Sequence, residues 1–169
     1  MSDSDDPIEK RVGRTLRDRE ETVAVAESCT GGLVGSLLTD IPGSSAYFDR
    51  SLVTYSYDAK QDLLAVSREA LDAHGAVSDP VARQMARAVR DTAGTDWGVA
   101  TTGVAGPTGG SPETPVGTVY VAVARAAPWE TGESDCTVST YEFEGSRTEV
   151  KAKIARRALS DLSEAIHDQ

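Results

Sequence analysis

The sequence contains few of the residues that build metal sites and disulfide frameworks. Its 169 residues include two cysteines, Cys29 and Cys136, and two histidines, His74 and His167. Two cysteines with no CxxC pair are too few for the disulfide framework of a small secreted fold. The histidines flank predicted helices, and no histidine-rich cluster indicates a zinc site. We therefore expect no metal ion and no disulfide framework.

Long apolar runs are also missing. No stretch approaches the roughly 18 residues of a membrane span. Residues 1–6 (MSDSDD) are acidic and polar, whereas a secretory signal starts with basic residues followed by an apolar stretch. Hydrophobic residues make up 39% of the chain, which is enough for the core of one domain. We expect a single cytoplasmic domain over residues 1–169, with residues 1–6 as a disordered tail and no membrane partner.

Positive charge is scarce. The chain has 17 Lys and Arg residues against 27 Asp and Glu residues, and its net charge is -10. Binding to duplex DNA draws most of its affinity from neutralising phosphates, so this surface disfavours a nucleic-acid partner. Because net charge supports solubility, an acidic composition with few lysines is typical of a protein from a salt-loving host.

The hydrophobic pattern predicts helices alternating with strands. Pro7 at the first helical position, with Asp6 as N-cap and Glu9 completing a capping box, predicts a helix that ends near Glu20. Apolar and β-branched runs predict strands at residues 22–27, 51–57, 97–102, 117–125 and 136–143. Periodicity and caps predict further helices that begin near residues 30, 59, 67, 78 and 146. Early alternation followed by consecutive strands indicates an α/β fold, a three-layer αβα domain with a mixed β-sheet.

The first candidate site is the segment 26–32 (AESCTGG), between a predicted strand and a predicted helix. Ligands in open α/β sheets bind outside the carboxyl ends of strands, and a helix N-terminus offers free N–H groups. Ser28 could combine a nucleophile with an oxyanion site there; the alternative is that Ser28 or Thr30 only caps the helix. Cys29 is a rival nucleophile, but no histidine lies near it in sequence, and a buried structural cysteine is the better interpretation.

The second candidate is Lys60, at a strand-to-helix junction beside Tyr55, Tyr57 and Asp58. A desolvated lysine can act as a neutral base, whereas a junction lysine that stays solvated has no such role. A short-chain reductase would need a lysine four residues after a tyrosine, and neither tyrosine is followed by one. No GxGxxG follows the first strand, so a Rossmann dehydrogenase is disfavoured.

The third candidate is the long irregular segment 103–116, which is rich in glycine and proline. Its backbone N–H groups could cradle an anion, or it could be a flexible crossing loop. It lacks the GK[ST] of a Walker A loop. Arg147 opens the last helix, where the dipole favours acids. A bound anion such as phosphate would explain the arginine, and a solvent-facing side chain without a role is the alternative.

Seven segments, in order, resemble the motifs of the CinA C-terminal family, the nicotinamide-mononucleotide deamidases. They are AESCTGG (26–32), GSSAYF (43–48), VTYSYDAK (53–60), HGAVS (74–78), TGVAGPTGG (102–110), PVGTVY (115–120) and FEGSR (143–147). Two residues depart from the family pattern: Tyr57 stands where many relatives carry a short polar residue, and Ser146 where many carry Asp.

The resemblance implies deamidation of nicotinamide mononucleotide to nicotinate mononucleotide, with release of ammonia. It implies Ser28 as nucleophile, Lys60 as base and Tyr55 as the helper of that base, and it implies no cofactor. The expected substrate-binding residues are Thr30, Gly31, Gly32, Ser44, Ser45, Thr102, Gly103, Gly106 and Arg147. The expected partner is a small-molecule nucleotide, and the expected assembly is a homo-oligomer (dimer or higher).

Two alternatives stay open. One is a non-catalytic regulatory module, because the family name comes from competence and DNA-damage contexts. The other is an amidase with a different substrate, because sequence alone does not reveal the pyridine pocket. The larger N-terminal domain of full-length CinA proteins has no counterpart in these segments, so its pyrophosphatase activity is not expected.

Overall fold

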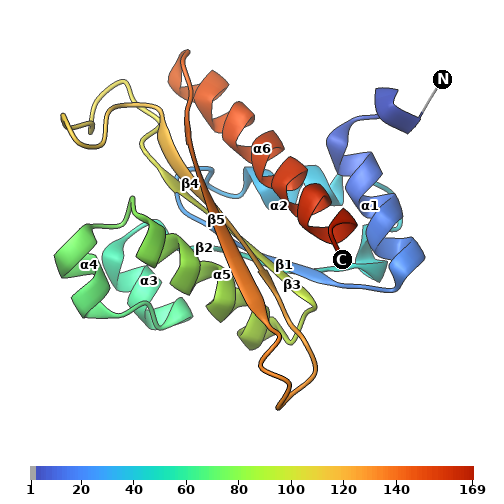
Figure 1. Ribbon diagram of the computed structural model, residues 1–169. Helices are drawn as coiled ribbons and strands as arrows, with labels where there is room; N and C mark the ends of the chain where they lie inside the picture. The colour runs from blue at the N-terminus through green and yellow to red at the C-terminus, as the bar shows by residue number, and fades with distance from the viewer. Residues whose placement is uncertain (1–2) are drawn as a thin grey trace.

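The computed structural model describes residues 3–169 and shows a five-stranded mixed sheet between two layers of helices (Figure 1). The strands are β1 (Val23–Glu27), β2 (Phe48–Val53), β3 (Trp97–Gly103), β4 (Thr118–Arg125) and β5 (Asp135–Glu142). The α-helices within these residues are α1 (Ile8–Arg19), α2 (Leu33–Thr39), α3 (Tyr57–Leu64), α4 (Arg68–His74), α5 (Asp79–Ala93) and α6 (Arg147–His167). The expected three-layer α/β fold is confirmed, and no helix of the described part of the chain is long and apolar enough to cross a membrane.

The strand order is β2-β1-β3-β4-β5. β1 runs parallel to both β2 and β3, whereas β4 and β5 are antiparallel additions. The carboxyl ends of the three parallel strands therefore meet at one edge of the sheet, where α/β proteins bind ligands.

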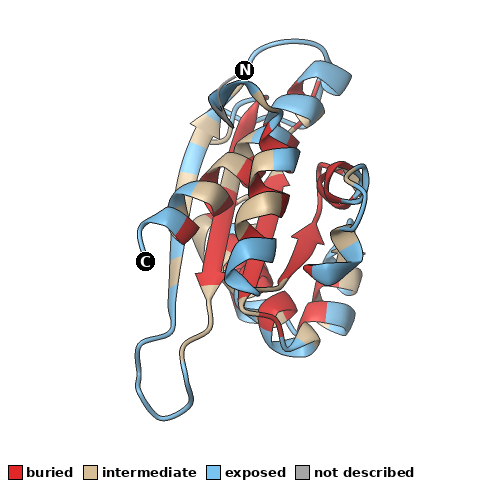
Figure 2. Cartoon of the chain, turned by 90° about the vertical axis from the view of Figure 1, so that its right-hand side faces the viewer, coloured by how far each residue is buried: buried red, intermediate tan, exposed pale blue. Residues whose placement is uncertain are grey.

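The two faces of the sheet carry different side chains. Residues of a strand alternate between faces, so the valines of β1 join the core under α1, α2 and α6, and its alanines join the core under α5. Figure 2 shows the central strands buried between the helical layers, whose outer faces are exposed. The small alanine face lets α5 lie close to the sheet.

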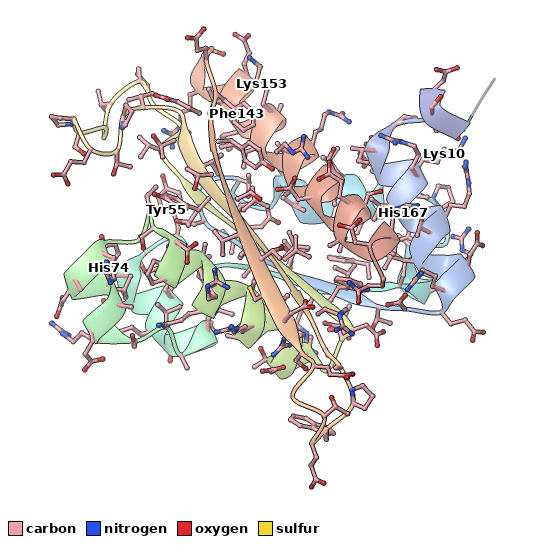
Figure 3. All side chains as sticks on the ribbon, in the orientation of Figure 1. Lys10, Tyr55, His74, Phe143, Lys153 and His167 are labelled. Carbon is pink, nitrogen blue, oxygen red and sulfur yellow. The ribbon has the colours of Figure 1, made fainter. Side chains whose placement is uncertain are left out.

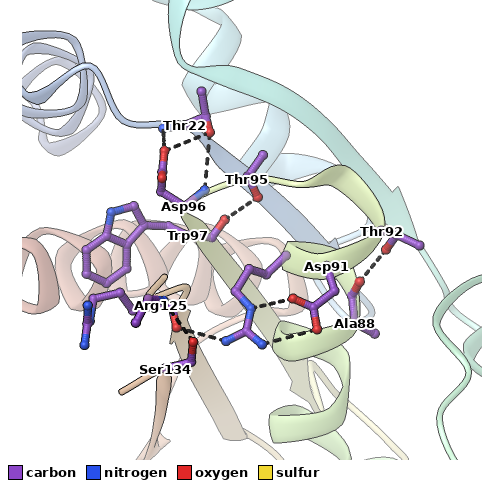
Figure 4. A network of polar contacts seen from close by, with 11 residues as sticks. Thr22, Ala88, Asp91, Thr92, Thr95, Asp96, Trp97, Arg125 and Ser134 are labelled. Carbon is purple, nitrogen blue, oxygen red and sulfur yellow. Dashed lines mark hydrogen bonds and ion pairs between the residues drawn. The ribbon is translucent and has the colours of Figure 1, made fainter. Parts of the chain in front are cut away.

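Polar contacts fix the opposite, amino-terminal edge of the sheet (Figure 4). Asp96 accepts hydrogen bonds from the backbone N–H of Thr22, at 2.8 Å, and from its hydroxyl, at 3.1 Å. Arg90 donates to the carbonyl of Arg125 at 2.9 Å, which ties the end of α5 to β4. These contacts hold the start of β1 beside the start of β3.

Two element boundaries differ from the sequence predictions. The strand predicted over 51–57 is β2, and it ends at Val53, because the Ser56 hydroxyl accepts a hydrogen bond from the Ala59 N–H and caps α3 instead. The aromatic residues of this run favour a strand, but the cap decides the conformation.

The start of the chain also differs from expectation. Pro7, and not Asp6, is the N-cap of α1, and no side chain caps that helix. The Asp6 carboxylate instead pairs with Lys10 and Arg14. Asp3–Asp5 forms a short 3-10 helix rather than the expected disordered tail, and residues 1–2 lie outside the described residues.

The close approach of α5 to β3 gives a test of the fold. A Cβ atom at Gly98 would lie 2.2 Å from the carbonyl oxygen of Ala86 and 2.8 Å from the Cβ of Arg90. We expect Gly98→Ala to lower the free energy of unfolding by about 3 kcal/mol, because α5 must move away from the sheet. Urea unfolding followed by circular dichroism measures this.

Gly94→Ala is the matched control, because a Cβ there meets no atom within 4 Å and only the left-handed backbone (φ +67°) opposes it. Its cost should be about 1 kcal/mol. Equal losses in the two variants would show that α5 does not pack against Gly98 as described.

Candidate active site

The site is built at the carboxyl ends of β1 and β3. Glu27 is the last residue of β1 and pairs in register with Thr101 of β3. Because side chains alternate between the two faces, Glu27 and Thr101 face α2, whereas Ser28 and Thr102 face the layer of α3 and α5. The adjacent residues Glu27 and Ser28 therefore lie on opposite faces of the sheet.

Ser28 and Lys60 form a hydrogen-bonded pair, although 32 residues separate them in the chain. The Nζ atom of Lys60 lies 2.8 Å from the Oγ atom of Ser28. Lys60 is completely buried, and burial lowers the pKa of its ammonium group from 10.5 to about 8. A substantial fraction of Lys60 is therefore neutral just above physiological pH, as a general base must be.

Two backbone carbonyls orient this amine. Lys60 Nζ donates to the carbonyl oxygen of Thr54, at 2.6 Å, and to that of Tyr55, at 3.3 Å. Carbonyl oxygens only accept hydrogen bonds, so the two N–H bonds of a neutral amine satisfy them. The remaining lone pair then points toward the Ser28 hydroxyl and can accept its proton.

The rival candidate nucleophile, Cys29, is a buried thiol. Its side chain is 6% exposed and belongs to the core under α2 and α6. Burial raises the pKa of the Cys29 thiol to about 12. The thiolate is the nucleophilic form of cysteine, so at neutral pH Cys29 is a packed, unreactive thiol, as the sequence analysis expected.

A buried carboxylate holds the turn that carries Ser28. Glu27 has no exposed surface, and it accepts hydrogen bonds from the backbone N–H groups of Gly32, Val34 and Gly35 at 2.9–3.2 Å. The hydroxyls of Thr30 and Ser51 also donate to it. Five donors compensate the desolvation of one charge, so Glu27 fixes the turn and the start of α2.

The sequence analysis did not identify Glu27. The signal available was an acidic residue at the end of a wholly apolar strand, three positions before a threonine and five before a glycine. Charged residues are almost never fully buried without partners, so this position itself indicates a network.

The Thr30 hydroxyl belongs to that network. Its hydroxyl donates to Glu27 at 2.6 Å and lies 2.8 Å from the Thr101 hydroxyl. Since Thr30 has one hydroxyl proton, Thr101 is the donor of the second bond. The Thr30 residue is 1% exposed and its hydroxyl is already paired, so only its backbone N–H is left for the expected substrate-binding role, which stays a prediction.

Some backbone N–H groups of the turn donate hydrogen bonds within the protein, and others have no acceptor there. The N–H of Ser28 donates to the carbonyl of Thr101, and the N–H of Gly31 donates to the carbonyl of Ser28. The amides of Cys29 and Thr30 have no hydrogen-bond acceptor among residues 3–169. These two N–H groups lie beside Ser28 and could donate hydrogen bonds to an anionic oxygen there.

A cavity of about 420 Å³ opens over Ser28. It is lined by Ser28, Cys29, Tyr55, Tyr57, residues 74–77, parts of the loop 102–114 and Arg147. Tyr55 and His74 lie together on this side of the molecule, far from Lys10 and His167 (Figure 3). None of the described lining residues is Asp or Glu, although the chain carries 27 of them. An anion in the cavity is therefore repelled less than an anion at the rest of the acidic surface.

Two hydrogen bonds position Ala76, in the segment between α4 and α5 that lines one side of the cavity. The Thr102 hydroxyl donates to the carbonyl of Ala76 at 2.8 Å, and the Tyr57 hydroxyl accepts from the N–H of Ala76 at 3.2 Å. Thr102 thus lines the cavity, as expected, and its proton is used to position the wall. Gly103 and Gly106 also line the cavity, as expected.

Arg147 and Tyr55 meet across the mouth of the cavity. Arg147 donates to the carbonyl of Gly106 at 2.6 Å and to the Tyr55 hydroxyl at 3.2 Å. Tyr55 touches Lys60 through its backbone carbonyl only. The Tyr55 side chain therefore does not relay a proton from Lys60 in this structure, and its contribution to the base is the orientation given by its carbonyl.

Four other expected substrate contacts do not line the cavity. Gly31 and Gly32 shape the turn, with φ values of +58° and +102°, which explains the glycines. Ser44 and Ser45 lie in a 3-10 helix (Ser44–Ala46) that precedes β2. Since β2 is parallel to β1, that helix lies at the amino-terminal edge of the sheet, about 17 Å from the site, the length of a five-residue strand. The structure does not bring Ser44 and Ser45 to this cavity, and their expected role in phosphate binding stays a prediction.

The described residues bring no three His, Cys, Asp or Glu side chains together in a way that could hold a metal ion.

The fold and the site define an α/β domain with a serine–lysine pair at the carboxyl edge of a mixed sheet. The family model of the CinA C-terminal domain matches residues 5–166, and the chain belongs to that family. The resemblance given by the sequence motifs is confirmed.

Relatives with the same domain are longer proteins. A CinA-like protein of Chlorobium limicola is 46% identical over 157 residues, which cover 93% of this chain and 36% of the relative. A CinA-like protein of Chlorobaculum tepidum is 49% identical over 155 residues, which cover 92% and 36%. The chain therefore spans little more than a third of the length of the curated relatives it matches.

Solved structures of similar length have the same fold. The competence/damage inducible protein CihA of Agrobacterium tumefaciens superposes with a TM-score of 0.87 and 38% identity, covering 95% of this chain and 93% of that one. A CinA superfamily protein of Klebsiella pneumoniae superposes with a TM-score of 0.88 and 33% identity, covering 96% and 97%.

The Glu27 network gives a second test. Glu27→Gln replaces an acceptor oxygen with an NH₂ group that must face a backbone N–H. We expect a loss of about 3 kcal/mol in the free energy of unfolding, because buried donors lose a charged acceptor. Urea unfolding measures the loss.

The control for this variant is Glu133→Gln, whose side chain is exposed. It should change stability by less than about 0.5 kcal/mol. A Glu27→Gln protein as stable as this control would contradict the network.

Proposed function

We propose that the protein is an amidohydrolase that converts nicotinamide mononucleotide to nicotinate mononucleotide and ammonia. The observation that carries this proposal is the buried Lys60 amine, 2.8 Å from Ser28 Oγ and with its pKa lowered to about 8. A serine with a neutral base beside it and open N–H groups next to it is the arrangement that acyl transfer needs. The family relationship supplies the substrate that the arrangement alone does not define.

The first half of the reaction makes an acyl-enzyme. Ser28 Oγ attacks the carboxamide carbon while Lys60 accepts the serine proton. The carbonyl oxygen becomes an oxyanion that the N–H groups of Cys29 and Thr30 stabilise, which is worth about 3 kcal/mol per donor. The C–N bond then breaks, Lys60 returns the proton to the leaving nitrogen, and ammonia departs.

The second half regenerates the enzyme. A water molecule attacks the ester carbon, and Lys60 accepts a proton from it. The C–O bond to Ser28 breaks, the serine oxygen recovers the proton from Lys60, and the product carboxylic acid leaves and gives its remaining proton to solvent. The same amine serves as base and acid in both halves, so no second titrating side chain is needed.

The cavity fits a nucleotide with one phosphate. Its volume of about 420 Å³ lies within the range of roughly 300–1,000 Å³ of small-molecule sites. Arg147 at the mouth offers a guanidinium that can leave the Gly106 carbonyl for a phosphate, which it binds more strongly. The absence of carboxylates from the described lining removes repulsion for that phosphate.

Two broader expectations belong to this proposal. The partner is a small-molecule nucleotide in the cytoplasm, handled without cofactor, nucleic acid or membrane. The protein forms a homo-oligomer, dimer or higher. Light scattering at several concentrations measures the assembly.

Ammonia release tests the substrate. Nicotinamide mononucleotide should release ammonia, whereas free nicotinamide and glutamine should release far less, because neither brings a phosphate to Arg147. Release from glutamine alone would indicate an amidase with another substrate. Release from none of the three would favour a non-catalytic module.

Replacing the nucleophile tests the mechanism. Ser28→Ala should lower deamidation by several orders of magnitude with a native circular-dichroism spectrum, because no other described side chain can form the acyl-enzyme. Cys29→Ala should keep most of the activity, since the thiol is protonated and buried. A dead Cys29→Ala beside an active Ser28→Ala would reverse the two roles.

The pH dependence tests the base. The neutral fraction of Lys60 rises with pH, so the single-turnover acylation rate should rise and level off above about pH 8. Lys60→Arg and Lys60→Ala should both lose at least about 100-fold, because arginine keeps its charge and cannot accept the serine proton. An active Lys60→Arg enzyme with an unchanged pH profile would exclude Lys60 as the base.

A further inference from the structure

Tyr57 lines the cavity, and the mechanism above gives it no role. It is the first residue of α3, and Lys60 follows three residues later, so the two side chains leave neighbouring positions on one side of the helix. The Tyr57 side chain is 51% exposed even though its hydroxyl is bonded to the N–H of Ala76. The hydrogen bond fixes the ring, and the exposed part of the ring is available to a ligand.

The charges around the cavity show what that ring can recognise. Arg147, His74 and Ser28 line the space, Lys60 lies buried behind Ser28, and no carboxylate is among the described lining residues. A cationic ligand ring would therefore find no acidic partner. The face of an aromatic ring, which carries negative potential, attracts such a cation without a formal charge.

Two tyrosines line the cavity, but they are not equivalent. The hydroxyl of Tyr55 already accepts a hydrogen bond from the Arg147 guanidinium. The hydroxyl of Tyr57 accepts from a neutral backbone amide. A cation is repelled near Arg147 and not near Ala76, so Tyr57 is the better surface for a positively charged ring.

We propose that Tyr57 determines specificity by placing its ring against the positively charged pyridinium of the substrate. This inference rests on the proposed function, because that function supplies a cationic ring with the carboxamide at Ser28. It goes further by predicting discrimination against the reduced nucleotide. The reduced form carries the same carboxamide, ribose and phosphate on a neutral dihydropyridine ring, so it loses the cation–π attraction alone.

Binding measurements with the two ligands test the proposal. Dissociation constants for nicotinamide mononucleotide and for its reduced form are measured by calorimetry in a Ser28→Ala background, which prevents turnover. Tyr57→Leu should weaken binding of the oxidised ligand about tenfold and that of the reduced ligand less than about twofold. Tyr57→Phe should keep the preference for the oxidised ligand, because it keeps the ring.

Two further variants serve as controls. Trp129→Leu removes an aromatic side chain that is 93% exposed and lies outside this cavity, and it should change neither constant. Tyr57→Gln is a second non-aromatic variant, with a polar end in place of the apolar one, and it should lose the preference as Tyr57→Leu does. Melting curves of all variants show that each is folded.

The outcomes separate this inference from the proposed function. Equal weakening of both ligands by Tyr57→Leu, or loss of preference in Tyr57→Phe, would overturn the role of the ring while leaving deamidation by the parent protein intact. Preference kept in Tyr57→Gln would overturn it too. If the parent protein releases no ammonia from nicotinamide mononucleotide, the proposed function fails, and the inference falls with it.

Discussion

The buried carboxylate of Glu27 is the interaction on which the site geometry depends. It joins the end of β1 to the first turn of α2 and to Ser51 of β2. A helix N-terminus would normally offer its free N–H groups to a ligand, but Glu27 takes three of them inside the protein. The N–H groups that remain without an acceptor among the described residues are those of Cys29 and Thr30, which lie in the turn beside Ser28. The network therefore leaves the free donors next to the serine and not at the start of the helix.

Local signals in the sequence predicted most of the fold. The alternating valines and alanines of residues 23–26 predict a strand, and Ser146 and Glu149 form the predicted capping box of α6. The error at β2 has a local cause as well, because two competing signals occupy the same few residues. A run of aromatic and β-branched residues favours a strand, and Ser56 within that run starts a helix. Propensity alone does not tell which signal prevails.

The site could be predicted only in part, because its contacts are long-range. The separation of 32 positions between Ser28 and Lys60 follows no spacing rule, and the pair was predicted from resemblance to a family. Glu27 was missed because its five donors come from two segments, residues 30–35 and Ser51 of β2, and no motif links them. The sequence does not place Ser44 relative to Ser28, because the order of motifs along the chain does not say at which end of the sheet each motif lies. A parallel β2 requires that residues before it lie at the opposite edge from Ser28.

Burial of Lys60 lowers the stability of the folded protein, and the same burial lowers the pKa of its amine, as the proposed base requires. In the unfolded chain its pKa is near 10.5, and in the folded protein burial lowers it to about 8. Between these values the unfolded state holds a proton that the folded state has released, so the contribution of Lys60 to stability rises with pH across this window. Below about pH 8 both states carry the charged amine, and its burial destabilises the folded state by the full amount, about 3 kcal/mol.

The carbonyls of Thr54 and Tyr55 favour the charged amine and oppose the lowering of its pKa. Desolvation outweighs them, and their remaining effect is geometric: they hold both N–H bonds of the neutral amine and leave its lone pair for Ser28.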